Sequence, residues 1–185
     1  MTPIDPALTE PLRDPQTMLA ALDFAGVAVF AATGAHERGG LKDSVANIEA
    51  TKEFVVNLAT WDLREAMNAS SIAAPHGFDE FAHAGLTKAP STVVRPPRVA
   101  ESPVQLECVL SQVVELEAPS PEAPNRMVIG RVVGIHIADH VIAERVVQIA
   151  LLDPIARLGY NQYTRVREAF AMTRPRWPDD ATPKP

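Results

Sequence analysis

Apolar and polar positions alternate along the second half of the chain with the period of two that is typical of β-strands. Val104, Leu106, Cys108 and Leu110 alternate with Gln105, Glu107 and Val109, close to a period of two, which predicts a strand with one face toward a core. This strand is expected to continue through Leu116 past a bulge. Further runs rich in β-branched residues predict strands at 27–30, 54–58, 127–137, 141–142 and 146–149.

Helical signals are fewer and short. Apolar spacing, capping residues and terminal glycines predict helices at 44–51, 62–70, 78–84 and 154–158, with Thr60 as the N-cap of the second and Gly85 and Gly159 ending the last two. Prolines interrupt the pattern at 90–103 and 118–124. The expected class is mainly β with short helices, an α+β chain built on a β-barrel. Residues 16–172 are expected to form one domain between a flexible segment 1–15 and a flexible proline-rich tail 173–185.

Composition narrows the class of protein. The net charge of −6 and the absence of a basic cluster argue against a nucleic-acid partner. The chain has one cysteine, so no intrachain disulfide can form, as is usual in a reducing compartment. It lacks a secretory signal pattern and a long apolar run. We therefore expect a cytoplasmic protein with no membrane association.

The segment 33–48 carries the clearest chemistry, because it follows a predicted strand and opens a predicted helix. Gly39 and Gly40 allow close approach of the backbone to a ligand, and Arg38 and Lys42 supply positive charge. The free amides of a helix N-terminus favour an anion, so a phosphate suits this segment. The residues alone favour a plain capping role for Asp43 or Ser44 over a phosphate site.

Other reactive side chains give weaker signals. His136 and His140 lie four apart within a strand pattern, so no metal site is expected. Cys108 alternates with apolar positions and is interpreted as a packing residue. No combination of nucleophile and base stands out, so the catalytic residues stay unassigned.

The order of several short motifs resembles the flavin reductase-like family, which includes the flavoredoxins. Lys42-Asp43-Ser44 followed by Asn47-Ile48 is similar to the family's KDT/S-x-x-NI segment. Six further segments follow in the family's order: 53–58, 67–71, 79–87, 95–103, 130–137 and 157–163. The resemblance covers about residues 27–170.

The resemblance implies an FMN-binding split barrel that pairs as a homodimer. It implies an oxidoreductase that passes hydride from NAD(P)H to flavin, in some members for a partner monooxygenase. It also implies cofactor-binding roles for one strand end and the loop after it, namely Thr33, Arg38, Gly39, Gly40, Lys42, Asp43 and Ser44.

The chain departs from the family pattern in two places. The 41 residues before Lys42 lack the family's R-P-x-A…ST strand and its N-x-A-P-x-S-F-F hairpin, so the barrel is expected to be incomplete at its N-terminus. Tyr160 stands where a second glycine is usual. The alternative is therefore a non-catalytic dimeric split-barrel protein that has lost full flavin binding. Pyridoxal phosphate and F420, which related split barrels hold, are further alternatives as ligands.

Overall fold

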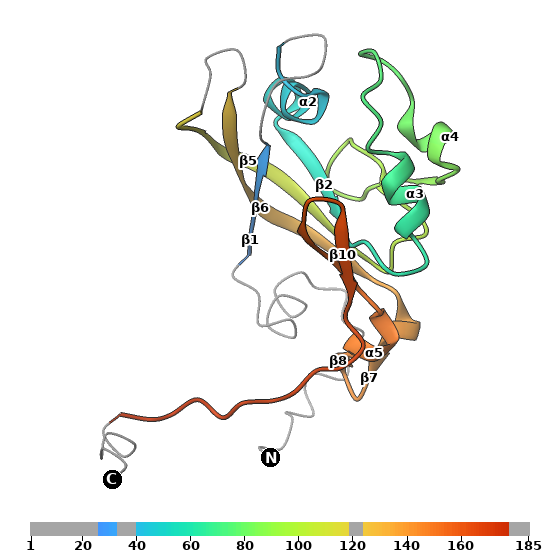
Figure 1. The fold of residues 1–185 in the computed structure, drawn as a ribbon, viewed down its shortest axis with the longest axis vertical. Helices are drawn as coiled ribbons and strands as arrows, with labels where there is room; N and C mark the ends of the chain where they lie inside the picture. Colours follow the sequence, from blue (N-terminus) through green and yellow to red (C-terminus); the bar gives the residue numbers. More distant parts are fainter. Residues whose placement is uncertain (1–25, 33–39, 119–123, 178–185) are drawn as a thin grey trace.

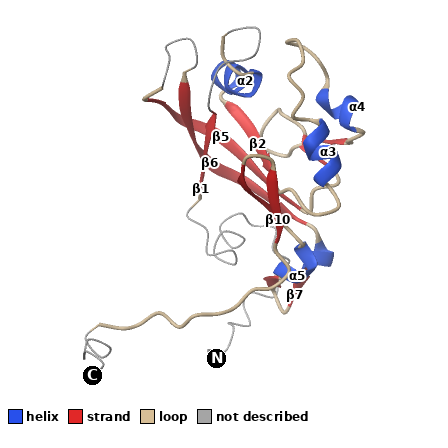
Figure 2. Cartoon of the chain, in the orientation of Figure 1, coloured by secondary structure: helices blue, strands red, loops and turns tan. Residues whose placement is uncertain are grey.

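The computed structural model describes residues 26–32, 40–118 and 124–177, and its architecture is mainly β with short helices (Figures 1 and 2). The main sheet is antiparallel in the order β1-β6-β5-β2. Its strands are β1 (Val27–Ala32), β6 (Asn125–Ile137), β5 (Val104–Leu116) and β2 (Glu53–Asn57). The predicted fold class is confirmed. The predicted segment 1–15 lies outside the described residues, as do 178–185 of the predicted tail.

Smaller elements surround this sheet. Three two-stranded ladders pair β3 (Lys88–Ala89) with β4 (Arg98–Val99), β7 (Ile142–Ala143) with β8 (Val146–Val147), and β9 (Ile155–Gly159) with β10 (Gln162–Arg165). The helices are α2 (Asp43–Thr51), α3 (Arg64–Ala69), α4 (Glu80–Ala84), α5 (Ile149–Leu152) and the 3-10 turn η2 (Asp139–Val141). Helix α2 lies at one end of the main sheet, and α3 and α4 lie together beside it (Figure 1).

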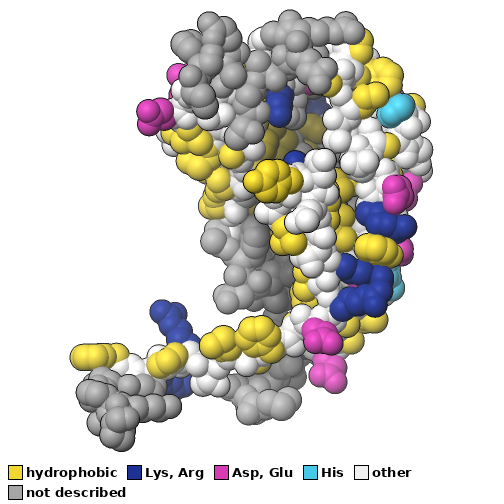
Figure 3. Space-filling model, viewed as in Figure 1, with side chains coloured by type: hydrophobic (Ala, Val, Ile, Leu, Met, Phe, Trp, Pro, Cys, Tyr) yellow, Lys and Arg dark blue, Asp and Glu magenta, His cyan; other side chains and the backbone are white. Residues whose placement is uncertain are grey.

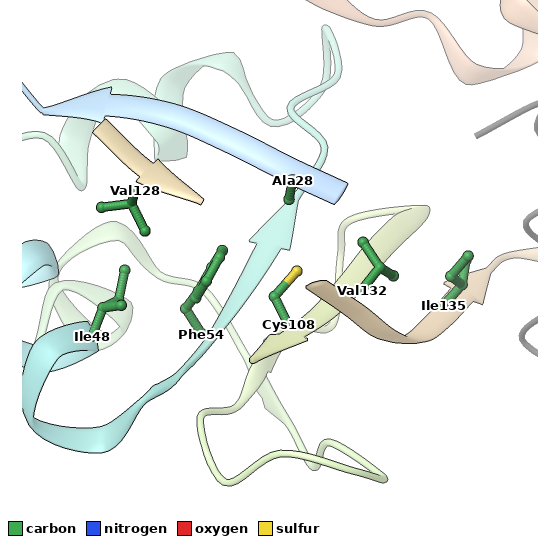
Figure 4. Packing of buried hydrophobic residues seen from close by; sticks show 7 residues of the cluster. All are labelled: Ala28, Ile48, Phe54, Cys108, Val128, Val132 and Ile135. Atoms are coloured by element: carbon green, nitrogen blue, oxygen red, sulfur yellow. The ribbon is translucent and has the colours of Figure 1, made fainter. Parts of the chain in front are cut away.

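The core lies where α2 meets the main sheet. Its buried members come from five elements and are Ala28, Ile48, Phe54, Cys108, Val128, Val132 and Ile135 (Figure 4). The rings of Phe30 and Phe54 meet edge to face with centroids 5.9 Å apart. Each fully buried large apolar side chain stabilises the fold by roughly 1.5–3 kcal/mol. The packing role expected for Cys108 is confirmed, because its side chain is fully buried.

Two glycines of β6 lie at irregular points of the ladder with β5. Gly130 pairs with Leu110 and Gly134 pairs with Glu107, and the register shifts directly after each of these β5 residues. A Cβ atom at Gly130 would lie 2.3 Å from Cζ of Phe54, so a side chain at that position cannot fit beside this ring. The bulge predicted within residues 104–116 is confirmed.

Three local predictions are wrong. The helix predicted at 154–158 is absent: Ile155–Gly159 form β9, because pairing with β10 overrides the helix-starting signal of Pro154. The helix of this region is α5, which begins at Ile149 and ends where Asp153 adopts a left-handed conformation (φ 49°). Because α5 begins inside the strand predicted at 146–149, that strand is only two residues long. Thr60 does not cap α3: it is buried and forms a β-bridge with Pro154, and Leu63 is the N-cap.

Candidate functional site

The turn that leads into α2 and the first two residues of that helix contain four of the predicted cofactor-binding residues: Gly40, Lys42, Asp43 and Ser44. Gly40 has a left-handed backbone (φ 84°) with open space where a side chain would lie, so glycine suits this point of the turn. Lys42 is the N-cap residue in an extended conformation, and its carbonyl accepts hydrogen bonds from the amides of Val45 and Ala46 at 2.9 and 3.1 Å. The turn therefore delivers an exposed lysine directly at a helix start.

The side chain of the N-cap residue, Lys42, makes no capping hydrogen bond to this helix end. Ser44 is exposed, and the carboxylate of Asp43 lies 3.2 Å from Nδ1 of His76 instead of receiving first-turn amides. The capping role that the residues alone favoured for Asp43 or Ser44 is therefore wrong, because Lys42 is the N-cap residue. The first amides of α2 lie next to Lys42, and an anion such as phosphate suits a helix start of this kind.

Helix α2 is held rigidly behind this end. Val45 and Ile48 are 2% and 6% exposed, so one face of the helix is packed against the core. Near its other end, Glu49 receives a hydrogen bond from Arg126 of β6 at 2.6 Å, and Lys52 ends the helix in a left-handed conformation. Anchoring of this kind fixes the position of the uncapped amides.

The remaining predicted site residues are Thr33, Arg38 and Gly39, and they lie outside the described residues. His76, in contrast, lies beside the turn although its sequence neighbours give no sign of it. It is 33 residues away from Asp43 and mostly exposed. Only the fold brings these two residues together, so His76 joins the candidate site as a neighbour of the helix start.

A second polar centre lies on β5 and was missed by the sequence reasoning. Glu107 is fully buried although the strand pattern placed it opposite the apolar face. Its carboxylate accepts hydrogen bonds from the amides of Thr92, Val93 and Val94 at 2.8, 2.7 and 2.9 Å. Nε2 of His136 lies 2.5 Å from the same carboxylate. The prediction of one core-facing side for β5 is therefore incomplete, because the segment 90–98 covers its other face.

These contacts determine the ionisation of Glu107. Burial raises the pKa of this carboxyl, but the hydrogen bonds from the loop amides and His136 outweigh that effect and lower the pKa to about 2. The carboxylate is therefore charged at neutral pH. A histidine oriented by a buried carboxylate also occurs in catalytic sites, but here the same carboxylate mainly fixes a loop.

Within the described residues, no group of three or more His, Cys, Asp or Glu side chains could hold a metal ion. In the same part of the chain, no helix combines the length and the apolar character needed to cross a membrane. Helix α2, which carries the candidate site, has nine residues.

The family model described as "Flavin reductase like domain" matches residues 15–162. This match covers most of the chain. The protein belongs to the flavin reductase-like family. Its fold is that of flavin reductase-like split barrels, as the structural neighbours also show.

Similar proteins support this membership. A curated but uncharacterized protein of Halalkalibacterium halodurans is 36% identical over 137 residues, which cover 74% of this chain and 66% of that protein. The chain thus spans just under two thirds of that relative's length. Among solved structures, nitrilotriacetate monooxygenase component B from Bacillus cereus aligns with a TM-score of 0.70 and 26% identity, over 80% of this chain and 77% of that one. The 2-nitrobenzoate 2-nitroreductase NbaA of Pseudomonas fluorescens aligns with a TM-score of 0.64 and 26% identity, over 82% and 70%.

Proposed function

We propose that this protein is an FMN-binding oxidoreductase of the flavin reductase type. The observation that carries the proposal is the start of α2, which follows Gly40 and carries the exposed Lys42 as an N-cap residue without a capping side-chain bond, within the part of the chain that matches the family model. A phosphate monoester fits the start of α2, because a small anion is bound by backbone amides of the first helical turn together with a cation such as Lys42. Residues 16–172 are proposed as the domain that carries this function.

Bound flavin would supply the redox chemistry by accepting hydride from NAD(P)H. The residues of this chain would bind and orient it. Lys42 would neutralise phosphate charge, and the amides of Asp43 and Ser44 would donate hydrogen bonds to it. The Asp43 carboxylate lies 3.2 Å from Nδ1 of His76, and this contact would limit its repulsion of an anion.

We also propose how the protein assembles. It would form a homodimer, and a partner monooxygenase would use the reduced flavin that it produces. One structural neighbour is component B of a nitrilotriacetate monooxygenase, and this supports a two-component arrangement. The donor nucleotide, NADH or NADPH, is open to direct assay.

An FMN titration of the purified protein tests the proposal. Lys42→Ala is expected to weaken FMN binding at least about tenfold, which corresponds to the loss of one charge-assisted contact. Lys88→Ala is the matched control, because Lys88 is also an exposed lysine but pairs with Asp79 near α4. Equal FMN affinity in both variants would place the phosphate elsewhere. A wild-type protein that does not bind FMN would favour the non-catalytic alternative.

A further inference from the structure

His76 is brought to the start of α2 by a tight turn in the segment that follows α3. The amide of Phe78 donates a hydrogen bond to the carbonyl of Pro75 at 3.1 Å, and Gly77 supplies a positive φ (85°) at the third position of this turn. Directly before the turn, Ala74 is buried. The backbone of His76 is therefore held on both sides, so its place beside α2 follows from the fold.

The ring of His76 contacts one acidic side chain. Its Nδ1 atom lies 3.2 Å from Oδ1 of Asp43, and the two side chains are 75% and 28% exposed. A histidine changes its charge between about pH 5 and 8, and both ring nitrogens of the protonated form donate hydrogen bonds. Protonated His76 thus compensates the Asp43 carboxylate through a charge-assisted hydrogen bond, whereas the neutral ring leaves that charge uncompensated.

Asp43 is the acidic residue of the first turn of α2, directly after Lys42. Its carboxylate would compete with a bound anion for the positive charge of Lys42 and for the amides of the helix start. Lys42 contributes +1 and Asp43 −1, so the three side chains sum to zero with a neutral His76 and to +1 with a protonated one. The affinity of this helix start for an anion therefore depends on the protonation of His76.

Two further acidic groups of the adjoining elements have partners of their own. On α2, Glu49 pairs with Arg126 at 2.6 Å. At the start of α4, Asp79 caps the helix and pairs with Lys88 at 2.7 Å. The charged residues within 36–38 lie outside the described residues. In the part of the chain that the structure describes, His76 is thus the titratable side chain in contact with Asp43.

Long-range charge has a weaker influence on this helix start. The chain has a net charge of −6, but interactions between exposed charges are largely screened beyond about 10 Å at 0.1 M salt. On the face that it draws, Figure 3 shows acidic and basic side chains side by side instead of one large patch of a single sign. The charge at the start of α2 is therefore set by the groups close to it.

We propose that Asp43 and His76 form a pH-sensitive charge switch at the phosphate end of the flavin site. With His76 protonated, the Asp43 carboxylate is compensated and a phosphate binds more tightly. With His76 neutral, the carboxylate repels the phosphate. This inference rests on the proposed function, because it needs the FMN phosphate at the start of α2, and it adds a regulation of that site by pH.

FMN titrations of the full chain and of His76→Gln, near pH 5 and near pH 8, test the switch. Glutamine can still donate a hydrogen bond to Asp43 but carries no charge. The wild type is expected to bind FMN about threefold to fivefold more tightly than the variant near pH 5, and equally near pH 8, since an exposed charge pair contributes about this much. The phosphate itself loses a proton near pH 6, but it does so with both proteins, so their affinity ratio at each pH isolates His76.

Two controls accompany this comparison. Riboflavin is FMN without the phosphate, and its affinity ratio between wild type and His76→Gln should stay at one near both pH values. His83→Gln is the matched variant, because His83 is also an exposed histidine but lies on α4 against the ring of Phe78. It should bind FMN like the wild type near both pH values.

The same titrations in an Asp43→Asn background show whether the two residues act as a pair. Asparagine keeps the size of the side chain and removes the charge that holds protonated His76. The threefold to fivefold effect of His76→Gln near pH 5 should therefore disappear in this background, about as a double-mutant cycle measures a direct coupling. An effect of unchanged size would mean that His76 acts on the phosphate without Asp43, and would overturn the switch.

The remaining outcomes separate the switch from the proposed function. An affinity ratio between wild type and His76→Gln that is the same near both pH values would overturn the switch and leave the flavin site standing. A Lys42→Ala variant that binds FMN like the wild type would remove the phosphate from this helix start and overturn the assigned site together with the switch. A wild type that does not bind FMN near either pH would overturn both as well.

Discussion

Two connecting segments beside the main sheet, 90–98 and 40–44, are built in opposite ways. In the first, a buried carboxylate receives three consecutive backbone amides, and Arg95 reaches Glu53 and the carbonyl of Thr51. In the second, the helix that follows has no side-chain cap, and its lysine is exposed. A segment whose amides are bound by a buried carboxylate serves stability. A helix start whose N-cap side chain makes no capping bond has the capacity to bind a ligand.

The largest effect is expected from Glu107→Gln. The substitution keeps the size of the side chain but removes its charge and turns an amide donor toward other donors. Breaking a buried charged network in this way costs about 3–5 kcal/mol. Urea unfolding measures it, with Glu115→Gln as control, because Glu115 lies on the same strand with a side chain 78% exposed. A loss equal to that of the control would mean that the 90–98 segment is not held by Glu107.

Acid should weaken the same segment. The folded pKa of Glu107 is about 2, below its ordinary value of 4.5, so its stabilising effect is full above pH 4.5 and disappears as the pH falls toward 2. The shift corresponds to on the order of 3 kcal/mol. The difference in unfolding free energy between wild type and Glu107→Gln should therefore shrink across this range. A constant difference between pH 5 and pH 2 would contradict the assignment.

A smaller effect is expected where β6 lies against the 90–98 segment. A Cβ atom at Gly134 would lie 3.3 Å from Cβ of Glu107 and 3.4 Å from Cγ2 of Val93. Gly134→Val should overpack this contact and cost about 1–3 kcal/mol, and Gly134→Ala should cost less. Chemical denaturation of the two variants gives the order. Equal stability of both with the wild type would show that the contact is loose.

The smallest effect, and one of opposite sign, is expected in the 40–44 turn. Ser44→Asp places a negative charge in the first turn of an uncapped helix, which should stabilise the protein by about 0.3–1 kcal/mol. The same charge should repel phosphate and weaken FMN binding. Thermal unfolding and FMN titration measure the two responses separately. A variant that gains stability and keeps its FMN affinity would argue against phosphate at this helix end.

The sequence predicted those parts of the fold that depend on local pattern. The strands at 27–30, 54–58, 104–116 and 127–137 have clear two-residue periodicity or β-branched runs, and all four are present. The helix predicted at 154–158 failed because proline at a first position suits a strand start as well as a helix start. In that region long-range pairing decided between the two.

In the candidate site, too, the sequence predicted what a local motif records and missed what depends on long-range contacts. The turn at Gly40 and Lys42 was identified by motif. Glu107 was not, because a polar residue in an alternating strand is assigned to solvent unless something covers it. Its covering segment precedes it by 13 to 15 residues, and His136 follows 29 residues later. Such contacts form only in the folded chain, so no local pattern records them.

The chain's one cysteine makes it a natural reporter of its own unfolding. The Cys108 side chain is fully buried, and burial, followed by the charge of Glu107, raises the pKa of its thiol to about 12. A thiol-specific reagent at neutral pH therefore reacts only with molecules that have opened the core. The labelling rate in native buffer would measure how often that opening occurs, without denaturant and without any engineered probe.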